Sequence, residues 1–374
     1  MRMISFTNLN TIFICLFLVL APSPLLFLPP TLPEQQQKKK ITSFFFTEST
    51  LSMAGLPPHP PLPSPSPPSS PLPLVGIEVL YSVPEHQLPA PLPSVQEILQ
   101  GSDVCQGRAD RVVQVGDHYV VKFGRDTDVM EAQNMIFVRD HLGDMVPRVY
   151  AVYQETEGGS TPPTTYMIIE FLHAQPLSAL WTAMDAAQKS EIIDTLRHAL
   201  GIIRNIPAPN YFGGLWRSSL RDEFLYDPFA EHDSPAQGPF NTEQELIEGI
   251  ILRYDAECSP KYRHKINFYR QMLPQVLQGD ERSVFTHCDL QPLNIMIGPG
   301  NRLTLIDWQQ SGWYPTWWEY VATMENNNWR SDWWTYLRYW MHEYPTHYSW
   351  IHTMYQELAD QSSPDSDVSM SFEM

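Results

Sequence analysis

The sequence contains few cysteines and few basic residues for its length. Its 374 residues include four cysteines, Cys15, Cys105, Cys258 and Cys288, which lie far apart and form no Cys-x-x-Cys pair. This spacing fits neither a disulfide framework nor a cysteine-based zinc site. Lys and Arg total 24 against 42 Asp and Glu, which gives a formal net charge of −18. Because a nucleic-acid-binding surface needs clustered Lys and Arg, we expect no nucleic-acid partner.

Proline is abundant only in the first quarter of the chain. Residues 1–94 contain 19 of the 35 prolines and none of the eleven tryptophans, all of which lie at or after Trp181. Alternation of Pro with Ser and Leu favours solvated polyproline II over packing. We therefore predict a disordered leader at 1–94 and an acidic disordered tail at 359–374. About 265 residues between them remain for folding, enough for one large domain or two lobes.

An apolar run at residues 12–20 follows Arg2, an outline that is shared with secretory signals. Pro22 and Pro24 interrupt the apolar stretch before it reaches the roughly 18 to 20 residues that a membrane span needs. We therefore expect no stable membrane span here. Two interpretations stay open: a signal or anchor, or an over-extended gene start with Met53 as the initiator.

The folded part begins with a pattern that is typical of strands around one helix. Residues 112–115 and 119–123 are β-branched and aromatic runs about a Gly-Asp turn, which predicts an antiparallel hairpin. Residues 129–142 carry an apolar helical stripe. Residues 148–154 and 166–172 predict a second pair of strands.

The remainder of the folded part is mainly helical. Residues 243–254 have helical periodicity and a polar cap before them. A short hairpin is predicted from 294–297 and 303–306, around Gly and Asn residues. Aromatic-rich helical stretches finish the chain, and Pro315 and Pro345 suit the first turns of two of them.

The predicted hairpin and the residues on either side of it carry a set of side chains with the spacing of a phosphate-transfer site. Asp289 follows His287 by two residues, Asn294 comes five residues later, and Asp307 ends an apolar strand thirteen residues further on. Phosphoryl transfer needs a carboxylate near the attacking hydroxyl and oxygen ligands that hold Mg²⁺ against nucleotide phosphates. Each residue alone also fits a turn cap. The ordered set favours a site, because a buried strand end is a costly place for an unpartnered carboxylate.

Lys122 and Glu131 supply a possible complement from the strand-rich part. Lys122 lies in an otherwise apolar strand, and Glu131 is in line with the apolar face of the helix that follows. An ion pair between them, with the ammonium directed at phosphate oxygens, would satisfy both groups. The alternative is a lysine that snorkels at a sheet edge and an acid at the margin of the stripe. No G-x-G-x-x-G phosphate loop is present.

These motifs resemble the aminoglycoside phosphotransferase and choline kinase type, and the Gly-Pro-Phe segment at 238–240 is similar to fungal members of that family. The resemblance covers about residues 95–358, and it is carried by 121–123, 131–132, 167–172, 287–295 and 305–308. It implies an α+β, bilobal protein-kinase-like fold: an N-lobe at 95–172, with a small antiparallel sheet and one helix, and a larger helical C-lobe at 173–358, with the catalytic loop at 287–294.

The resemblance also implies an activity and a role for each site residue. The expected activity is transfer of the γ-phosphate of ATP, with Mg²⁺, to a hydroxyl group of a small molecule. Asp289 would be the catalytic base, Asn294 and Asp307 the Mg²⁺ ligands, and Lys122 the phosphate-binding cation supported by Glu131. Three successive backbone positions would meet the adenine: Glu170, Phe171 and Leu172. His287 would order the loop without binding metal.

Three positions depart from the family pattern. Cys288 stands where the family often has Gly, Ala174 where Gly often follows the adenine-binding segment, and Gln309 where many fungal relatives have an acid. These departures leave a second hypothesis open, a nucleotide-binding pseudokinase or interaction module. The chain lacks the Arg after His287 and the Asp-Phe-Gly of protein kinases. A small-molecule substrate is therefore favoured over a peptide.

The substrate and the compartment are less constrained by the sequence. Residues 313–343 are aromatic and contain four acids, Glu319, Glu325, Asp332 and Glu343. This segment could form a cleft that accepts a cationic substrate, but a packed core with solvated acids is the favoured interpretation. Because ATP is consumed inside cells, we expect a cytoplasmic protein, with a secreted or anchored one as the alternative.

Overall fold

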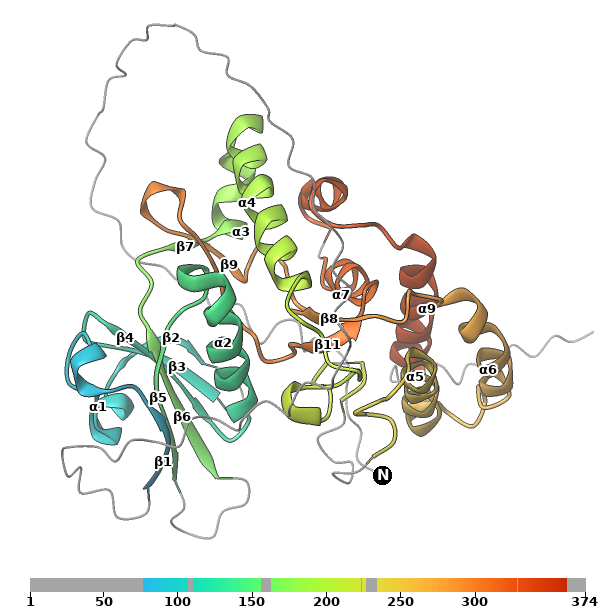
Figure 1. The fold of residues 1–374 in the computed structure, drawn as a ribbon, viewed down its shortest axis with the longest axis horizontal. Coiled ribbons are helices and arrows are strands. Elements are labelled where there is room, and N and C mark those ends of the chain that lie inside the picture. The colour runs from blue at the N-terminus through green and yellow to red at the C-terminus, as the bar shows by residue number, and fades with distance from the viewer. Residues whose placement is uncertain are drawn as a thin grey trace, which may run out of the picture. The chain divides into compact units, whose positions relative to one another are not determined.

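The computed structural model describes residues 77–106, 110–155, 163–222, 224–226, 234–327 and 329–361 (Figure 1). The apolar run at 12–20 and the predicted tail from residue 362 onwards lie outside these ranges. Within them, no helix is both long enough and apolar enough to cross a lipid bilayer.

The N-terminal lobe is built on a six-stranded antiparallel sheet, in the order β1-β5-β6-β4-β3-β2. Its strands are β1 (Ile77–Ser82), β2 (Ser102–Gln106), β3 (Asp110–Val115), β4 (Tyr119–Gly124), β5 (Val149–Glu155) and β6 (Thr164–Glu170). Its α-helices are α1 (Val95–Leu99) and α2 (Val129–Leu142). The predicted hairpin is confirmed as β3 with β4, and the predicted strand pair as β5 with β6. Helix α2 has the predicted bounds, and the short helix α1 was not predicted.

The predicted boundary between leader and folded part was wrong. Strand β1 pairs with β5, from Ile77 opposite Glu155 to Ser82 opposite Ala151, so the sheet begins well before residue 95. Ser94 is the N-cap of α1 and forms a reciprocal capping box with Glu97. The prediction failed because prolines stand on both sides of β1, and this strand has only six residues.

The C-terminal lobe is mainly helical and contains two small sheets. Its α-helices are α3 (Leu177–Leu180), α4 (Ala186–Arg204), α5 (Glu243–Glu257), α6 (Lys265–Val276), α7 (Trp318–Glu325), α8 (Trp333–Tyr336) and α9 (Pro345–Gln361). Its strands are β7 (Gln175–Pro176), β8 (Ser283–Thr286), β9 (Ile295–Ile297), β10 (Leu303–Leu305) and β11 (Gly312–Pro315). The predicted hairpin is confirmed as β9 with β10. The α+β class and the two-lobed kinase-like organisation are likewise confirmed.

Two proline predictions had different outcomes. Pro345 begins α9, as predicted, and this helix continues to Gln361, three residues into the predicted tail. Pro315 does not begin a helix. It ends β11 opposite Ser283 of β8, and α7 begins three residues later. A strand end tolerates proline because the missing N–H leaves few ladder bonds unmade.

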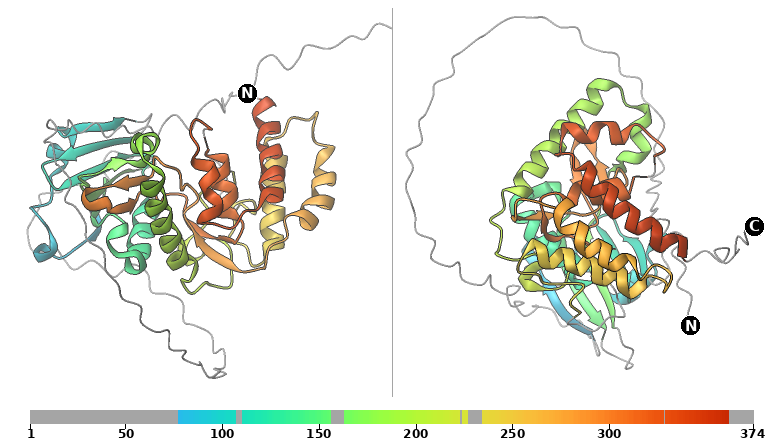
Figure 2. Two further views of the ribbon diagram at one scale, coloured as in Figure 1. Left: turned by 90° about the horizontal axis from the view of Figure 1, so that it is seen from above. Right: turned by 90° about the vertical axis from the view of Figure 1, so that its right-hand side faces the viewer.

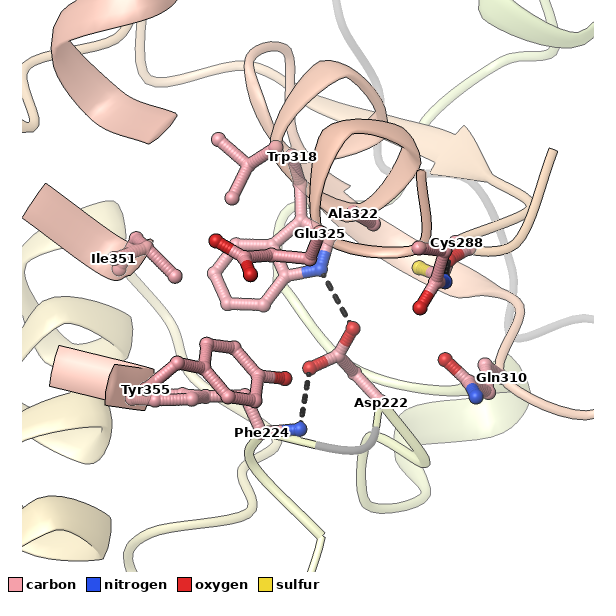
Figure 3. Close-up of a pocket in the computed structure, with 11 residues that line it drawn as sticks. Asp222, Phe224, Cys288, Gln310, Trp318, Ala322, Glu325, Ile351 and Tyr355 are labelled. Carbon is pink, nitrogen blue, oxygen red and sulfur yellow. Dashed lines mark hydrogen bonds between the residues drawn. The ribbon is translucent and has the colours of Figure 1, made fainter. Parts of the chain in front are cut away.

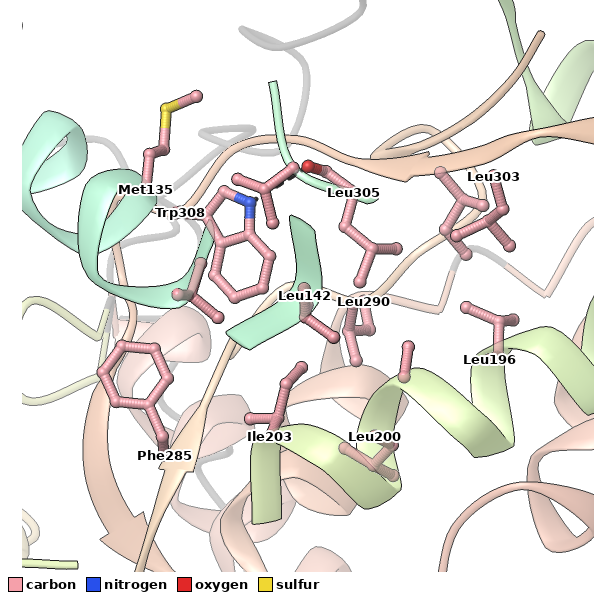
Figure 4. Close-up of a cluster of buried hydrophobic side chains, with 14 of the residues drawn as sticks. Met135, Leu142, Leu196, Leu200, Ile203, Phe285, Leu290, Leu303, Leu305 and Trp308 are labelled. Carbon is pink, nitrogen blue, oxygen red and sulfur yellow. Dashed lines mark hydrogen bonds between the residues drawn. The ribbon is translucent and has the colours of Figure 1, made fainter. Parts of the chain in front are cut away.

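A shared apolar core joins α2 of the N-lobe to the C-lobe. Figure 4 shows side chains from α2, α4 and the β9–β10 hairpin packed together, among them Met135, Leu200 and Leu305. The buried amide of Asn134 on α2 adds two hydrogen bonds to this junction, to the carbonyl oxygens of Trp308 at 2.9 Å and Ser311 at 3.1 Å. Helix α2 is therefore held directly against the segment that carries Asp307.

A second core lies among the last helices of the chain. Helices α5, α6 and α9 pack side by side, and α9 also contacts α7 (Figure 2). The carboxylate of Glu357 on α9 accepts hydrogen bonds from the hydroxyls of Tyr254 and Tyr269, both at 2.7 Å. This packing fixes α7, whose N-terminal part supports the loop between β8 and β9.

Candidate active site

The loop between β8 and β9 brings two of the predicted site residues into contact. Nδ2 of Asn294 donates to the carboxylate Oδ2 of Asp289 at 2.6 Å and to the backbone oxygen of Asp289 at 3.0 Å. Both amide hydrogens of Asn294 are thereby directed at Asp289. The amide oxygen Oδ1 is the atom of Asn294 that remains for a cation, because only oxygen carries the lone pairs that a hard metal ion needs.

Two further amides bind the other oxygen of the Asp289 carboxylate. Nε2 of Gln291 and Nδ2 of Asn326 each lie 2.8 Å from Oδ1. Neither residue was predicted from the sequence. Gln291 lies two residues from Asp289, so its proximity was a usable signal. Asn326 lies 37 residues away at the end of α7, and no local pattern connects it to the loop.

The loop is supported from the protein interior by Glu319 of α7. This side chain is fully buried and accepts the backbone N–H groups of His287 at 2.8 Å and Cys288 at 3.1 Å. Burial raises the pKa of Glu319, against the opposing effect of these backbone donors. The interpretation of Glu319 as part of a cation-accepting cleft was therefore wrong, because its carboxylate is used by the loop backbone.

His287 orders the loop through both ring nitrogens. Nδ1 accepts the backbone N–H of Asp289 at 3.2 Å, so Nε2 carries the proton and donates it to the carbonyl oxygen of Ile306 at 3.0 Å. The ring also packs on Trp308, with centroids 4.4 Å apart. Burial lowers the pKa of His287 to about 4, so the imidazole is neutral near pH 7. Its contacts are those of the loop-ordering residue that was expected.

Cys288 has a backbone conformation that side chains other than glycine rarely adopt. Its φ is +72°, in the left-handed region, and its side chain is fully buried. This is the position where the family resemblance leads one to expect glycine. The loop therefore keeps the shape that glycine would favour and accepts a strain of about 1–2 kcal/mol from the Cβ. Asp307 also has a positive φ, of +65°.

The predicted ion pair of the N-lobe is confirmed. Nζ of Lys122 on β4 lies 2.6 Å from Oε2 of Glu131 on α2, and both residues are buried. Burial disfavours the ammonium form, but the carboxylates of Glu131 and Asp307 outweigh it and raise the pKa of Lys122. Nζ also lies 3.4 Å from Oε1 of Gln309. The Lys122 ammonium therefore lies within the electrostatic influence of Asp307, on the segment that follows the β9–β10 hairpin.

The three positions predicted to meet an adenine, residues 170–172, are the last residue of β6 and the two that follow it. The N–H of Glu170 donates to the carbonyl oxygen of Arg148 at 2.8 Å, and the N–H of Phe171 to that of His118 at 2.9 Å. Among the residues that the structure describes, none accepts a hydrogen bond from the N–H of Leu172. The Leu172 amide is thus the one of these three that can still donate to a ligand.

A small pocket, with a volume of about 20 Å³, lies beside the loop between β8 and β9 (Figure 3). Cys288 and Asn326 border it on the loop side. Its wall includes two acids and three aromatic rings, Asp222, Glu325, Phe224, Trp318 and Tyr355. Sequence reasoning did not identify the pocket, because its residues come from segments that are far apart in the chain.

The acids of the pocket are held in position by specific donors. Asp222 accepts the indole N–H of Trp318 at 3.0 Å and the backbone N–H of Phe224 at 2.9 Å (Figure 3). Burial, opposed by these donors, raises the pKa of Asp222 to about 6. Both oxygens of Glu325 lie 3.1 Å from Nδ1 of His352 on α9. Burial also raises the pKa of Glu325.

The four acids predicted for a cation-accepting cleft are separated in the structure. Of these four, only Glu325 lines the pocket. Asp332 forms an ion pair with Lys189 at 2.9 Å, and Glu343 lies 3.5 Å from Arg338. Many of the rings in this segment are core residues, as the alternative interpretation stated.

Comparisons with known proteins identify the family of the chain. The model of the phosphotransferase enzyme family matches residues 103–352, well over half of the chain. Similar solved structures include a thermostable mutant of aminoglycoside phosphotransferase APH(4)-Ia, with 14% identity over 70% of this chain and 80% of that chain and a TM-score of 0.42. Spectinomycin phosphotransferase APH(9)-Ia has 14% identity over 70% and 79%, with a TM-score of 0.41.

Choline kinase LicA from Streptococcus pneumoniae has 18% identity over 69% of this chain and 83% of that chain, with a TM-score of 0.37. A comparison with curated protein sequences finds no significant match. The family match includes β4 with Lys122, α2 with Glu131 and the whole loop from His287 to Asp307. The chain therefore belongs to the phosphotransferase enzyme family.

Proposed function

We propose that this protein is a cytoplasmic, ATP- and Mg²⁺-dependent phosphotransferase that transfers the γ-phosphate of ATP to a hydroxyl group of a small molecule. The observation that carries the proposal is the arrangement of the Asp289 carboxylate. Asn294 holds it at 2.6 Å, and the backbone N–H of Ile306 donates to the carbonyl oxygen of Asn294 at 3.0 Å. Hydrogen bonds thus connect the loop that carries the candidate base and Asn294, a candidate metal ligand, to the end of the β9–β10 hairpin, next to the second candidate ligand, Asp307.

The nucleotide side of this arrangement consists of Lys122 and the segment after β6. Glu131 holds the Lys122 ammonium in its charged form, and a buried lysine of this kind binds phosphate oxygens as a point charge. The N–H of Leu172, for which the described part of the chain offers no acceptor, suits the ring nitrogen of an adenine. These groups would place the phosphate chain of ATP between Lys122 and the loop.

The oxygen donors of the hairpin fit Mg²⁺. This ion prefers oxygen ligands and usually takes one or two carboxylates together with substrate phosphates and water. Asn294 presents Oδ1, since its Nδ2 is bonded to Asp289, and Asp307 presents a carboxylate. No cluster of three or more His, Cys, Asp or Glu side chains occurs in the described ranges, so phosphate oxygens would complete the coordination. When bound, Mg²⁺ would neutralise charge on the phosphates.

Asp289 would orient the acceptor hydroxyl and take its proton. Because the transition state of phosphoryl transfer asks for little covalent participation by the protein, catalysis would come from positioning and charge neutralisation. Three side-chain amides hold the Asp289 carboxylate in position, those of Gln291, Asn294 and Asn326. Glu319 holds the backbone of the same loop from below.

The pocket beside the loop has room for one small group, about the size of an ammonium, so we favour an acceptor that carries an amine. Asp222 and Glu325 offer negative charge when ionised, and the faces of Phe224, Trp318 and Tyr355 are suited to a cation or to its apolar surroundings. Because burial raises the pKa of both acids, binding of such an acceptor should weaken as the pH falls towards 6.

The test of the proposal is Asp289→Asn, assayed by phosphorylation of a metabolite extract. We expect loss of Mg²⁺-dependent phosphorylation, with ATP affinity retained in a separate binding measurement. Asp280→Asn, at a surface turn that lies outside the site, is the matched control and should keep full turnover. Phosphorylation by Asp289→Asn at the wild-type rate would refute the proposal.

One observation favours a second candidate, a nucleotide-binding protein without turnover. Gln309 occupies a position near the Lys122 ammonium where relatives of this type often have an acid, and Cys288 strains the loop. If the wild-type protein turns over no ATP against a broad panel of acceptors but is stabilised against heat by ATP, this second candidate is correct.

A further inference from the structure

The amide of Asn326 links the candidate base to the pocket. Its Nδ2 lies 2.8 Å from Oδ1 of Asp289 and 3.5 Å from the carbonyl oxygen of Cys288. Asn326 follows directly after α7 and also borders the pocket. One side chain therefore contacts both the Asp289 carboxylate and the space in which an acceptor would bind.

The position of Asn326 is fixed by its backbone and by its neighbour. Its N–H donates to the carbonyl oxygens of Ala322 and Met324, which closes the last turn of α7. The preceding residue, Glu325, is bonded to His352 of α9. A side chain on a backbone anchored in this way loses little further conformational entropy when it holds a partner.

The two oxygens of the Asp289 carboxylate are held from different directions. Asn294, a candidate metal ligand, donates to Oδ2, whereas Asn326 donates to Oδ1 from the wall of the pocket, and Gln291 adds a second donor to Oδ1. Donors on both oxygens resist rotation of the carboxylate plane. Without Asn326, Oδ1 would lose the donor that restrains it from the end of α7.

We propose that Asn326 is a positioning residue, which fixes the orientation of the Asp289 carboxylate through Oδ1 so that this oxygen meets the acceptor hydroxyl. The inference rests on the proposed function. In that reaction the hydroxyl proton moves to Asp289 as the new oxygen–phosphorus bond forms, and the bond from the γ-phosphorus to the bridging oxygen breaks to release ADP. The arriving hydroxyl takes the place of one of the two amides at Oδ1, and the other keeps the oxygen oriented.

The test uses Mg·ATP alone as the probe, with water as the acceptor, and the variant Asn326→Leu, which removes the donor at similar volume. Loss of one hydrogen bond to a charged group should lower kcat for ADP release about tenfold to hundredfold. The KM for ATP should stay within about twofold, since Asn326 lies on the pocket side of Asp289. Asn327→Ala, at the adjacent asparagine, is the control and should keep the wild-type kcat.

The decisive comparison places Asn326→Leu in an Asp289→Asn background. A residue that acts through Asp289 should cause little further loss of the residual rate there, because the effects of residues that act as a unit are not additive. The inference would be overturned if Asn326→Leu lowered the rate by the same factor in that background as in the wild type, or if it raised the KM for ATP as much as it lowered kcat. Either result would indicate a general structural role.

A second measurement does not depend on turnover. The denaturant midpoints of the wild type, Asn326→Leu, Asp289→Ala and the double variant form a thermodynamic cycle. We expect the double variant to shift the midpoint by less than the sum of the two single shifts, and additive shifts would overturn the inference. If the wild type releases no more ADP than Asp289→Asn, the proposed function fails, and the midpoint cycle alone then decides whether Asn326 holds Asp289.

Discussion

Oε2 of Glu319 accepts the backbone N–H of His287 at 2.8 Å, inside the protein and directly beneath the loop that carries Asp289. The other oxygen of the same carboxylate accepts the N–H of Cys288. A single buried side chain thus satisfies two successive backbone donors that would otherwise have no water to bind. The position of Asp289, the next residue, depends on this support.

Glu319→Gln should destabilise the protein. The amide has one acceptor oxygen, so one of the two buried N–H groups loses its partner, at a cost of about 1–3 kcal/mol in the free energy of unfolding. Denaturant titration measures this change. The control is Glu343→Gln, whose side chain is 41% exposed and near Arg338. It should change the free energy of unfolding by less than about 0.5 kcal/mol, and an equal loss in both variants would contradict the role of Glu319.

Glu131→Leu should be strongly destabilising, because it removes the nearest carboxylate from the buried Lys122 ammonium. Loss of one partner from a buried ion pair costs about 3–5 kcal/mol. The double variant Lys122→Met, Glu131→Leu should recover most of this loss, since apolar side chains of similar volume can replace such a pair. Denaturant unfolding of the two variants measures the recovery.

ATP binding should respond differently from stability in the same variants. If Lys122 binds phosphate, the stable double variant should have an affinity for Mg·ATP at least about tenfold below that of the wild type, because a charge-assisted hydrogen bond is lost. Calorimetry gives this affinity. If the double variant is stable and binds ATP as tightly as the wild type, Lys122 does not bind the nucleotide, and its ion pair with Glu131 has a structural role alone.

The residues that could be predicted from the sequence lie on local patterns. Lys122 was detectable because its strand is otherwise apolar, and Glu131 because it stands in line with Met135 on the helix; the structure shows the two in contact. Asp289 and Asn294 are five residues apart in one loop, a separation over which spacing is informative, and their side chains are hydrogen-bonded.

The residues that could not be predicted act across the fold. Asn326 and Glu319 reach the loop from α7, more than thirty residues away, and nothing near them in sequence indicates which side chains α7 packs against. Acidic residues in an aromatic segment look alike in composition, so Glu319 could not be distinguished from Glu325. Strand β1 was missed because it has only six residues and follows a proline-rich stretch.

Stability should fall as the pH is lowered from about 6.5 to about 4, because of His287. Burial lowers the pKa of this imidazole to about 4 in the folded protein. In that interval the unfolded state binds a proton that the folded state does not, so the free energy of unfolding decreases by about 3 kcal/mol in total. Denaturant titration at several pH values measures the slope. In His287→Gln this contribution is absent, and an unchanged slope in that variant would contradict the prediction.

Asp222 should oppose this trend. Burial raises its pKa to about 6, so between about pH 6 and 4 the folded state binds a proton that the unfolded state lacks. This uptake stabilises the folded protein as the pH falls. In Asp222→Asn the opposing contribution is absent, and the loss of stability on acidification should be steeper than in the wild type. If stability falls less steeply with pH in that variant than in the wild type, the pKa of Asp222 is not raised in the folded protein.

Cys288→Gly should be more stable than Cys288→Ala. Both variants lose the buried thiol, but only glycine also relieves the strain of φ +72°. Because the left-handed conformation costs a Cβ-bearing residue about 1–2 kcal/mol and glycine costs part of that in chain entropy, we expect a difference of about 0.5–1 kcal/mol. Denaturant midpoints of the two purified variants give this value.

Cys258 provides the matched control, because it is also buried and free but has an ordinary φ of −66°. At this position the order should reverse, with Cys258→Ala more stable than Cys258→Gly, since glycine there loses chain entropy without relief of strain. The same order at both cysteines would mean that lost packing, and not backbone conformation, decides the effect at Cys288. Opposite orders would show that the loop holds a glycine-like shape against the side chain that it carries.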